Sequence, residues 1–181
     1  MKEKFSLHNK VVLITGGGSG IGESIAFTFA SKGAIVHILD QNLDDALKTA
    51  EVINKKNFTA KAYECDVSKS KNVKEVINEI SKTSTIDILI NNAGVAHVGN
   101  IESCKEKDLD HLYEVNIKGV FNCTKAIIPL MVKNKSGCII NLASIASSVG
   151  IKDRFAYSMS KGAVLTMTYS IATDYIKNNI R

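Results

Sequence analysis

The sequence is poor in the residues on which several classes of protein depend. It has one proline, four cysteines and no tryptophan among 181 residues. The cysteines, at positions 65, 104, 123 and 138, form no C-x-x-C pair and do not cluster with histidine, which argues against a zinc site or a redox pair. We therefore expect no metal, and reduced thiols in a cytoplasmic protein.

Long apolar runs and compact basic blocks are also missing. The polar start MKEKFSLHNK precedes only four apolar residues, so we expect neither a signal peptide nor a membrane-spanning segment. The net charge is +5, but the lysines are scattered and often stand beside Asp or Glu, so nucleic-acid binding is not expected. With 45% hydrophobic and 23% charged residues, the composition predicts one folded domain over residues 1–181.

Short apolar runs alternate along the chain with longer segments of helical periodicity. The predicted strands are Val11 to Ile14, Ala34 to Leu39, Thr59 to Tyr63, Ile86 to Ile90 and Cys138 to Leu142. The predicted helices cover residues 20–32, 43–55, 70–81, 106–133 and 155–178, with a kink expected at Pro129. This alternation predicts an α/β fold with a parallel sheet, because parallel neighbours need a crossover and a helix supplies it.

The stretch VVLITGGGSGIGESIAF passes from a strand through glycines into an amphipathic helix. Gly16 allows a tight exit from the strand, Gly20 lets the backbone approach a pyrophosphate, and Gly22 permits close packing of helix on strand. Phosphates are favoured at the helix N-terminus, where N–H groups are unpaired. The alternative is a flexible connector, which the flanking strand and helix argue against.

Asp40 ends the second predicted strand, eighteen residues after Gly22. A carboxylate there can accept hydrogen bonds from ribose hydroxyls and would repel the 2′-phosphate of NADP. Ser19, in the glycine turn, is not basic either, so the sequence favours NAD over NADP. The alternative for Asp40 taken alone is an ordinary turn aspartate.

Four motifs occur in series: TGGGSGIG at 15–22, NNAG at 91–94, Ser144 after the fifth strand, and Tyr157-x-x-x-Lys161. Each motif alone is weak, but their order and spacing over almost the whole chain resemble the short-chain dehydrogenase/reductase family. The resemblance implies a doubly wound Rossmann sheet of strand order 3-2-1-4-5. It also implies binding of NAD(H) or NADP(H) and interconversion of an alcohol and a carbonyl compound.

The resemblance also implies roles for particular residues. Asp66 and Val67 would contact adenine, and Asn92 would support the adenosine side of the cofactor and the central strand. Asn116 resembles the asparagine that holds a water behind the catalytic lysine; the alternative is a helix-interior asparagine that bonds locally. The cofactor-binding residues expected on these grounds are Gly16, Gly18, Ser19, Gly20, Ile21, Gly22, Asp40, Asp66, Val67, Asn92, Gly94, Tyr157 and Lys161.

The chemistry requires a base that works near neutral pH and a donor that fixes the substrate oxygen. Tyr157 is the candidate base; a free phenol loses its proton only near pH 10, and the ammonium of Lys161, one helical turn on, can favour the phenolate. Ser144 can hydrogen-bond the substrate oxygen, with Ser147 and Ser148 as competitors for that role. The four histidines have no spacing that suggests a triad or a metal site.

The chain departs from the family pattern after the predicted catalytic helix. Family members usually continue with a further strand, a proline-glycine substrate loop, short helices and a last strand. Without them the apolar strand CIINL would be a bare sheet edge. We therefore expect a fragment, the ordered part of something longer, or a chain covered by a partner. The resemblance also implies association through residues 106–133 and 155–178 into a homodimer or homotetramer.

These features predict an NAD(H)-dependent oxidoreductase that interconverts a small secondary alcohol and a ketone, a sugar derivative among the candidates. One alternative is a 3-oxoacyl-carrier-protein reductase, which would prefer NADPH; Asp40 and Ser19 argue against it. A second alternative is a catalytically silent dinucleotide-binding or assembly module.

Overall fold

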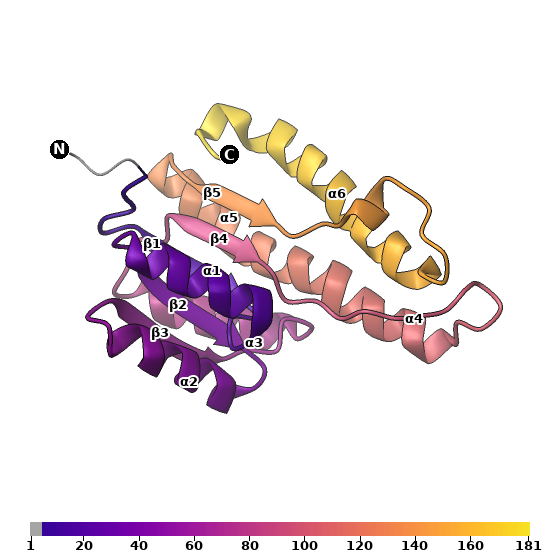
Figure 1. Ribbon diagram of the computed structural model, residues 1–181. Helices are drawn as coiled ribbons and strands as arrows, with labels where there is room; N and C mark the ends of the chain where they lie inside the picture. The colour runs from indigo at the N-terminus through magenta and orange to yellow at the C-terminus, as the bar shows by residue number, and fades with distance from the viewer. Residues whose placement is uncertain (1–4) are drawn as a thin grey trace.

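Five parallel strands form the centre of the molecule, with helices on both sides (Figure 1). The computed structural model describes residues 5–181; the first four residues of the polar N-terminal stretch, where no signal peptide is expected, lie outside the described residues. The strands are β1 (Val11–Thr15), β2 (Ile35–Asp40), β3 (Thr59–Glu64), β4 (Ile88–Asn91) and β5 (Cys138–Asn141). Each lies within two residues of its predicted bounds.

The helices occupy the predicted crossovers between strands. They are α1 (Gly20–Ser31), α2 (Leu43–Asn54), α3 (Ser70–Ser81), α4 (Glu106–Leu112), η1 (Tyr113–Lys118), α5 (Gly119–Asn134), η2 (Ile145–Ser147), α6 (Phe155–Tyr175) and η3 (Ile176–Asn178). The start of α2 shows how local chemistry sets a boundary, since the Asn42 side chain accepts hydrogen bonds from the N–H groups of Asp44 and Asp45. None of the helices in residues 5–181 has the combination of length and apolar character that crossing a membrane requires.

The strand order is β3-β2-β1-β4-β5, which confirms the predicted Rossmann arrangement. In the parallel register, Val12 of β1 is opposite Val36 of β2 on one side and Ile88 of β4 on the other. The order reverses between β1 and β4. In open α/β sheets, the crevice outside the carboxyl ends of the strands at such a switch point is where ligands bind.

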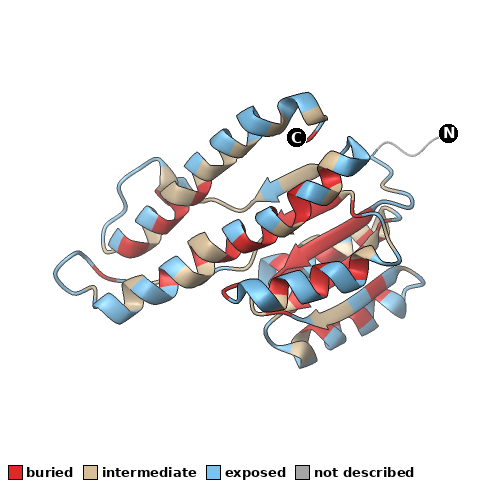
Figure 2. Cartoon of the chain, turned by 180° about the vertical axis from the view of Figure 1, so that it is seen from behind, coloured by how far each residue is buried: buried red, intermediate tan, exposed pale blue. Residues whose placement is uncertain are grey.

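Alternation along the strands divides the core into two layers. Leu13 and Leu89 face the cluster covered by α3 and α5, whereas Ile14 and Ile90 face the cluster covered by α1 and α2. Figure 2 shows the buried residues concentrated in the strands and on the inward faces of the helices. The near-continuous apolar runs of β1 and β4 are therefore explained by burial on both faces.

The long helical pattern predicted over residues 106–133 is not one α-helix. It is divided by the π-helical turn η1, and α5 then runs from Gly119 to Asn134 with Pro129 inside it. The α-helical hydrogen-bond pattern is thus interrupted at η1, and the kink expected at Pro129 stays a prediction. Such π-turns are often found at functional sites, and η1 contains Asn116.

β5 is the edge strand of the sheet, as predicted, but part of its outer side is paired with residues 180–181. After η3 the chain returns to the sheet, where the Ile139 N–H donates to the Arg181 carbonyl over 2.8 Å and the Arg181 N–H donates to the Gly137 carbonyl over 3.0 Å. Gly137 and Ile180 form a parallel bridge, and Ile180 is buried in the core layer beneath α5. The outer side of β5 is thus paired at Gly137 and Ile139, whereas the side chain of Ile140 remains 40% exposed.

Candidate active site

The glycine turn connects β1 to α1 by a backbone path that ordinary side chains would obstruct. Gly16 and Gly20 have φ of +63° and +55°, in the left-handed region that favours glycine. A Cβ at Gly22 would overlap the Gly16 carbonyl oxygen and approach the Asn92 amide. Only glycine at position 22 therefore lets the first turn of α1 pack directly against the turn that precedes it.

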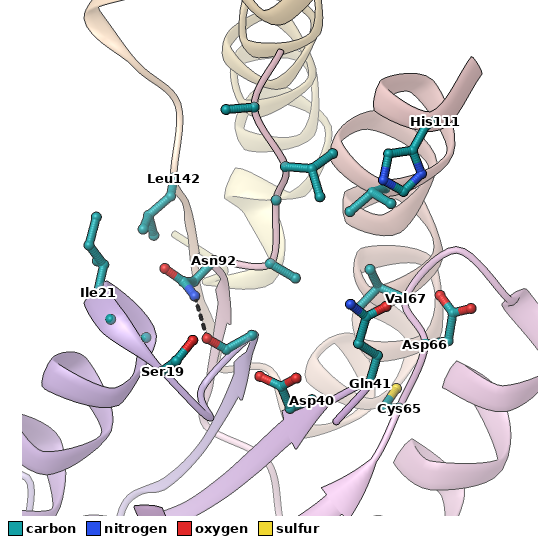
Figure 3. Close-up of a pocket in the computed structure, with 18 of the residues that line it drawn as sticks. Ser19, Ile21, Asp40, Gln41, Cys65, Asp66, Val67, Asn92, His111 and Leu142 are labelled. Atoms are coloured by element: carbon teal, nitrogen blue, oxygen red, sulfur yellow. Dashed lines mark hydrogen bonds between the residues drawn. The ribbon is translucent and has the colours of Figure 1, made fainter. Parts of the chain in front are cut away.

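Asn92, after β4, ties the switch point together. Its Nδ2 donates to the carbonyl oxygens of Thr15 and Gly16 over 2.9 and 2.8 Å. The dashed line at Asn92 in Figure 3 marks a hydrogen bond of this amide at the edge of the pocket. The backbone N–H of Asn92 also donates to Thr15 Oγ1 over 3.1 Å. The two strand ends that flank the crevice are thus fixed to each other before any ligand binds.

Asp40 holds the glycine turn from the other side. Its Oδ2 accepts a hydrogen bond from the Gly18 N–H over 2.9 Å, and its Oδ1 accepts one from the Asn42 N–H over 3.0 Å. The Gly18 carbonyl accepts a further bond from Thr49 Oγ1 over 3.1 Å. Gly18 therefore shapes the turn from beneath and does not itself line the cleft.

Asp66 and Val67 line the cleft at the carboxyl end of β3. Oδ1 of Asp66 accepts from both the N–H and the Oγ of Ser68, over 2.9 and 2.7 Å. The Val67 carbonyl accepts from Asn122 Nδ2 over 2.8 Å, which ties this segment to α5. Both predicted adenine contacts are thus held in fixed positions around the opening.

Tyr157 and Lys161 project from α6 into the same cleft. Lys161 is only 7% exposed, and its Nζ donates to the Leu142 carbonyl at the end of β5 over 2.6 Å. Burial lowers the pKa of the Lys161 ammonium below its ordinary value. Lys161 is therefore a buried side chain and does not lie on a solvated face of α6.

Asn116 packs against α6 and does not line the cleft. Its Oδ1 accepts from the Val95 N–H over 2.8 Å, and its Nδ2 donates to the Val95 carbonyl over 2.9 Å and to Ser160 Oγ over 3.0 Å. The side chain thus clamps the segment after β4 to α6. Its role toward a water behind Lys161 stays a prediction.

Ser144 caps the short helix η2 immediately after β5. Its Oγ accepts from the Ala146 N–H over 3.2 Å, and its own N–H donates to Ser147 Oγ over 3.2 Å. Ser144 is partly buried, lies at the strand exit as expected, and η2 packs against α6. It does not line the cleft, so its contact with a substrate oxygen also stays a prediction.

The cleft that collects these residues has a volume of about 450 Å³. Apart from Gly18, all the residues predicted to bind the cofactor line it. No cofactor-binding role was predicted for the remaining lining residues, which are Gln41, Cys65, Ala93, Val95, Ala96, His111, Val115 and Leu142. Five of these residues adjoin a predicted residue in the chain, and Val115 is one of them because it precedes Asn116. The exceptions are Ala96, His111 and Leu142. Figure 3 shows His111 on its own helix, away from the strand ends.

The sequence matches the model of a known protein family over most of its length. The family model described as short chain dehydrogenase matches residues 10–181. The chain belongs to the short-chain dehydrogenase/reductase family. The resemblance stated on the motifs is thereby confirmed.

Relatives in this dehydrogenase/reductase family match along nearly the full chain. An uncharacterized oxidoreductase of Thermotoga maritima is 40% identical over 177 residues, which are 97% of this chain and 70% of that protein. A 3-oxoacyl-[acyl-carrier-protein] reductase of the same organism is 37% identical over 179 residues, 97% of this chain and 72% of that protein. The chain thus spans about 70% of the length of these two relatives.

Solved structures of family members share the fold closely. A gluconate 5-dehydrogenase from Burkholderia cenocepacia, in complex with NADP and tartrate, superposes with a TM-score of 0.94 at 32% identity over 98% of this chain and 70% of that one. An NAD⁺-bound xylitol dehydrogenase also gives 0.94, at 31% identity over 99% of this chain and 69% of that one. Both NAD and NADP therefore occur among the neighbours in this family.

The cleft of this family member fits a dinucleotide on its own geometry. The left-handed glycines leave the N-terminus of α1 open to a pyrophosphate, and Gly20 has open space where a Cβ would stand. Asp40 lies at one end of the lining and Tyr157 and Lys161 come from the opposite edge of the sheet. In residues 5–181, no cluster of three His, Cys, Asp or Glu side chains is arranged to hold a metal ion.

Proposed function

We propose that the protein is an NAD(H)-dependent oxidoreductase that interconverts a secondary alcohol and a ketone. The observation that carries the proposal is that Tyr157 and Lys161 line the same cleft as the glycine turn and Asp40. A nicotinamide dinucleotide held by that turn would supply or accept the hydride. The protein's own residues then have to orient the substrate and move one proton.

Tyr157 is the proposed acid and base at the substrate oxygen. In the oxidation direction its phenolate takes the hydroxyl proton, and in the reduction direction its hydroxyl returns a proton to the carbonyl oxygen. The buried ammonium of Lys161, one helical turn away, favours the phenolate by its charge. Ser144 is proposed to hold the substrate oxygen, while Asn116 acts indirectly by fixing Val95 and α6.

NAD is the proposed cofactor in preference to NADP. The Asp40 carboxylate is held at the rim by the Gly18 and Asn42 N–H groups, where a ribose would be bound, and its charge opposes a 2′-phosphate. The first turn of α2 adds Asp44 and Asp45, and Lys48 is engaged with Asp45 over 3.0 Å. None of the residues that line the cleft beside Asp40 is basic.

The substrate class that we favour is a small hydroxylated compound such as a sugar derivative. Support comes from the gluconate and xylitol dehydrogenases, which are among the closely superposed structures. Reduction of a 3-oxoacyl thioester is the alternative activity, because a 3-oxoacyl-[acyl-carrier-protein] reductase is among the relatives. The charge of Asp40 argues against it, since that activity would prefer NADPH. A silent dinucleotide-binding module is the third possibility, and it would bind NADH without turnover.

We further propose that the protein forms a homodimer or homotetramer through the α4–α5 and α6 helices. Large apolar side chains are exposed on these helices and on the adjoining turns η1 and η3, among them Tyr113, Phe121, Tyr169 and Ile176. Such exposed apolar groups mark interaction surfaces when they are contiguous. A cytoplasmic location belongs to the same proposal, since the four cysteines are free thiols and two of them are buried.

The test is an NADH fluorescence titration followed by initial-rate assays with NAD⁺ or NADP⁺ and a panel of secondary alcohols. Saturable NADH binding with NAD⁺-linked turnover is expected. Binding without turnover on any alcohol or ketone would support the silent module instead. Turnover with NADPH and a 3-oxoacyl thioester alone would favour the reductase alternative.

A further inference from the structure

Four hydrogen-bonded side chains form a row at the carboxyl ends of β4 and β5. Asn91 and Asn141, the last residues of these strands, are partners in the parallel register. Asn91 Nδ2 donates to Asn141 Oδ1 over 2.8 Å and to Thr124 Oγ1 of α5 over 3.1 Å. Asn141 Nδ2 donates in turn to Thr168 Oγ1 of α6 over 2.9 Å. This polar row therefore joins α5, β4, β5 and α6 to one another.

Stability alone does not explain why these positions are polar. Asn91 is 3% exposed, and its Oδ1 is buried without a hydrogen-bond partner in residues 5–181. Leu89 and Ile139, two residues earlier on the same face of their strands, are apolar and pack in the layer covered by α3 and α5. An apolar side chain at position 91 would avoid burying an unpaired amide oxygen. The polar row thus fits a role in fixing the geometry of the surrounding elements.

Asn141 directly precedes the residue that receives the buried lysine of the cleft. The Leu142 N–H donates to the Asn91 carbonyl over 3.0 Å, so the peptide group after Asn141 is fixed to β4. The Leu142 carbonyl accepts from Lys161 Nζ over 2.6 Å. The end of β5 therefore sets the place of the Lys161 ammonium.

α6 is attached to the end of β5 at a second point, which is Thr168. Lys161 and Thr168 are seven residues apart, so they lie on the same side of α6, about 10 Å apart along its axis. Thr168 donates its hydroxyl proton to the Val164 carbonyl over 2.8 Å and accepts from Asn141. Figure 1 shows α6 running alongside β5, with which it is in contact. The bond between Thr168 and Asn141 therefore restricts sliding and rotation of α6 against β5.

We infer that Asn141 and Thr168 are positioning residues for the proposed proton-handling pair, Tyr157 and Lys161. This inference rests on the proposed function and deepens it. The bond between the two side chains holds α6 in the register at which the Lys161 ammonium meets the Leu142 carbonyl and stays one helical turn from Tyr157. Neither Asn141 nor Thr168 lines the cleft, so both act through Lys161.

The experiment compares Thr168→Val with Thr168→Ser. Valine has the shape of threonine but cannot accept from Asn141, whereas serine keeps the hydroxyl. With saturating NAD⁺ and the best alcohol of the panel, the pH at which kcat/KM is half-maximal should rise by about 0.5–1 pH unit in Thr168→Val, because a displaced ammonium favours the Tyr157 phenolate less. At lower pH, kcat/KM should fall about three- to tenfold with NADH affinity within about threefold of the parent. Thr168→Ser should restore the parent profile.

Thr166→Val is the matched control on the same helix. The Thr166 side chain is exposed, and within the described part of the chain its hydroxyl bonds only the Gly162 and Ala163 carbonyls of α6. This variant should keep the parent pH profile. The other titratable side chains that line the cleft come from the ends of β2 and β3 and from α4, and they are Asp40, Cys65, Asp66 and His111. Because none of them lies on α6, they should titrate alike in all the variants.

Asn141→Ala tests the other end of the bond. It should shift the profile in the same direction as Thr168→Val, and the double variant should shift it no further than Asn141→Ala alone, since both changes remove one interaction. Additive shifts would contradict action through a shared bond.

Crystal structures of the variants give a readout that does not depend on turnover. The distance between Lys161 Nζ and the Leu142 carbonyl is 2.6 Å in the parent. It should exceed about 3.5 Å in Thr168→Val and stay within hydrogen-bond range in Thr166→Val. An unchanged distance or an unchanged pH profile in Thr168→Val, even with lower stability in urea, would overturn the inference. A parent protein that binds NADH but oxidises no alcohol would instead overturn the proposed function, and the distance would still decide whether Thr168 positions Lys161.

Discussion

The carboxylate of Asp40 accepts a hydrogen bond from the backbone N–H of Gly18 over 2.9 Å. The residue expected to select the cofactor is therefore also a support of the turn expected to bind its phosphates. Substitution at this position can act by two routes, through charge and through the shape of the turn. Variants that separate these routes are the most informative.

Asp40→Asn should relax the preference for NAD. The amide oxygen can still accept from Gly18, but the negative charge that opposes a 2′-phosphate is gone, so the ratio of kcat/KM for NADPH to that for NADH should rise about 10- to 100-fold. Initial rates with both cofactors measure it. Asp44→Asn removes an exposed charge four residues away and should change the ratio by less than about threefold. An unchanged ratio in Asp40→Asn would refute the specificity role.

Gly22→Ala should unfold or distort the cofactor turn. The added Cβ would overlap the backbone carbonyl of Gly16, which cannot move without distorting the turn. We therefore expect the free energy of unfolding to fall by about 1–3 kcal/mol and NADH binding to be lost. Gly162→Ala is the matched control, because a Cβ at that position of α6 meets open space. It should raise the free energy of unfolding by about 0.5–1 kcal/mol. If the packing is as described, urea unfolding should show a lower free energy of unfolding for Gly22→Ala than for the parent, and a higher one for Gly162→Ala.

The buried His37 should make the fold sensitive to acid. Burial, with a contribution from Lys61, lowers the pKa of its imidazole to about 4, its Nδ1 lies 3.1 Å from the Tyr63 hydroxyl, and its Nε2 is buried without a partner in residues 5–181. The unfolded chain takes up this proton near pH 6.5. The contribution of His37 is thus fully present above about pH 6.5 and is lost as the pH falls toward 4, by about 3 kcal/mol at most.

Urea unfolding at pH 7.0 and 5.0 tests this linkage. His37→Leu should show a smaller loss of stability between the two pH values than the parent protein, since the leucine has no proton to bind. His8→Gln removes an exposed histidine and should follow the parent. Equal pH dependence in His37→Leu and the parent would mean that His37 is not held neutral by the fold.

Ser144 and Ser147 share one hydrogen-bonded cap, so activity must decide between them. If Ser144 holds the substrate oxygen, Ser144→Ala should lower kcat/KM about 10²-fold with NADH affinity intact. Ser147→Ala removes the acceptor of the Ser144 N–H, which should lower local stability by about 1 kcal/mol. It should lower kcat/KM by less than about tenfold. The reverse order of effects would transfer the role to Ser147.

Much of this architecture could be predicted because it depends on local patterns. The apolar strand segments, the glycine turn and the Y-x-x-x-K spacing are properties of neighbouring residues. The structure has strands and a turn at these positions, and Tyr157 and Lys161 line one cleft. The contact between Lys161 and the Leu142 carbonyl could not be predicted, because it joins residues nineteen positions apart through the packing of α6 on β5. The same is true of the clamp between Asn116 and Val95.

Two features of the structure could not be predicted, and for the same reason. The π-turn η1 has no compositional signal, because a π-helical turn is built from the same residue types as the α-helices on either side of it. The return of Ile180 and Arg181 to the edge of β5 involves only two residues, too few for a periodic pattern. Both features depend on tertiary packing and not on local propensity.

The central claim is that Tyr157 handles the proton in a site completed by a bound dinucleotide, and Tyr157→Phe tests it most directly. Phenylalanine keeps the ring and removes only the hydroxyl. Turnover of the best alcohol found in the panel and NADH binding by fluorescence should be measured on the same preparation. The account predicts a fall in kcat/KM of about 10²- to 10⁴-fold with NADH affinity within about threefold of the parent. A phenylalanine variant that turns over at the parent rate would contradict it.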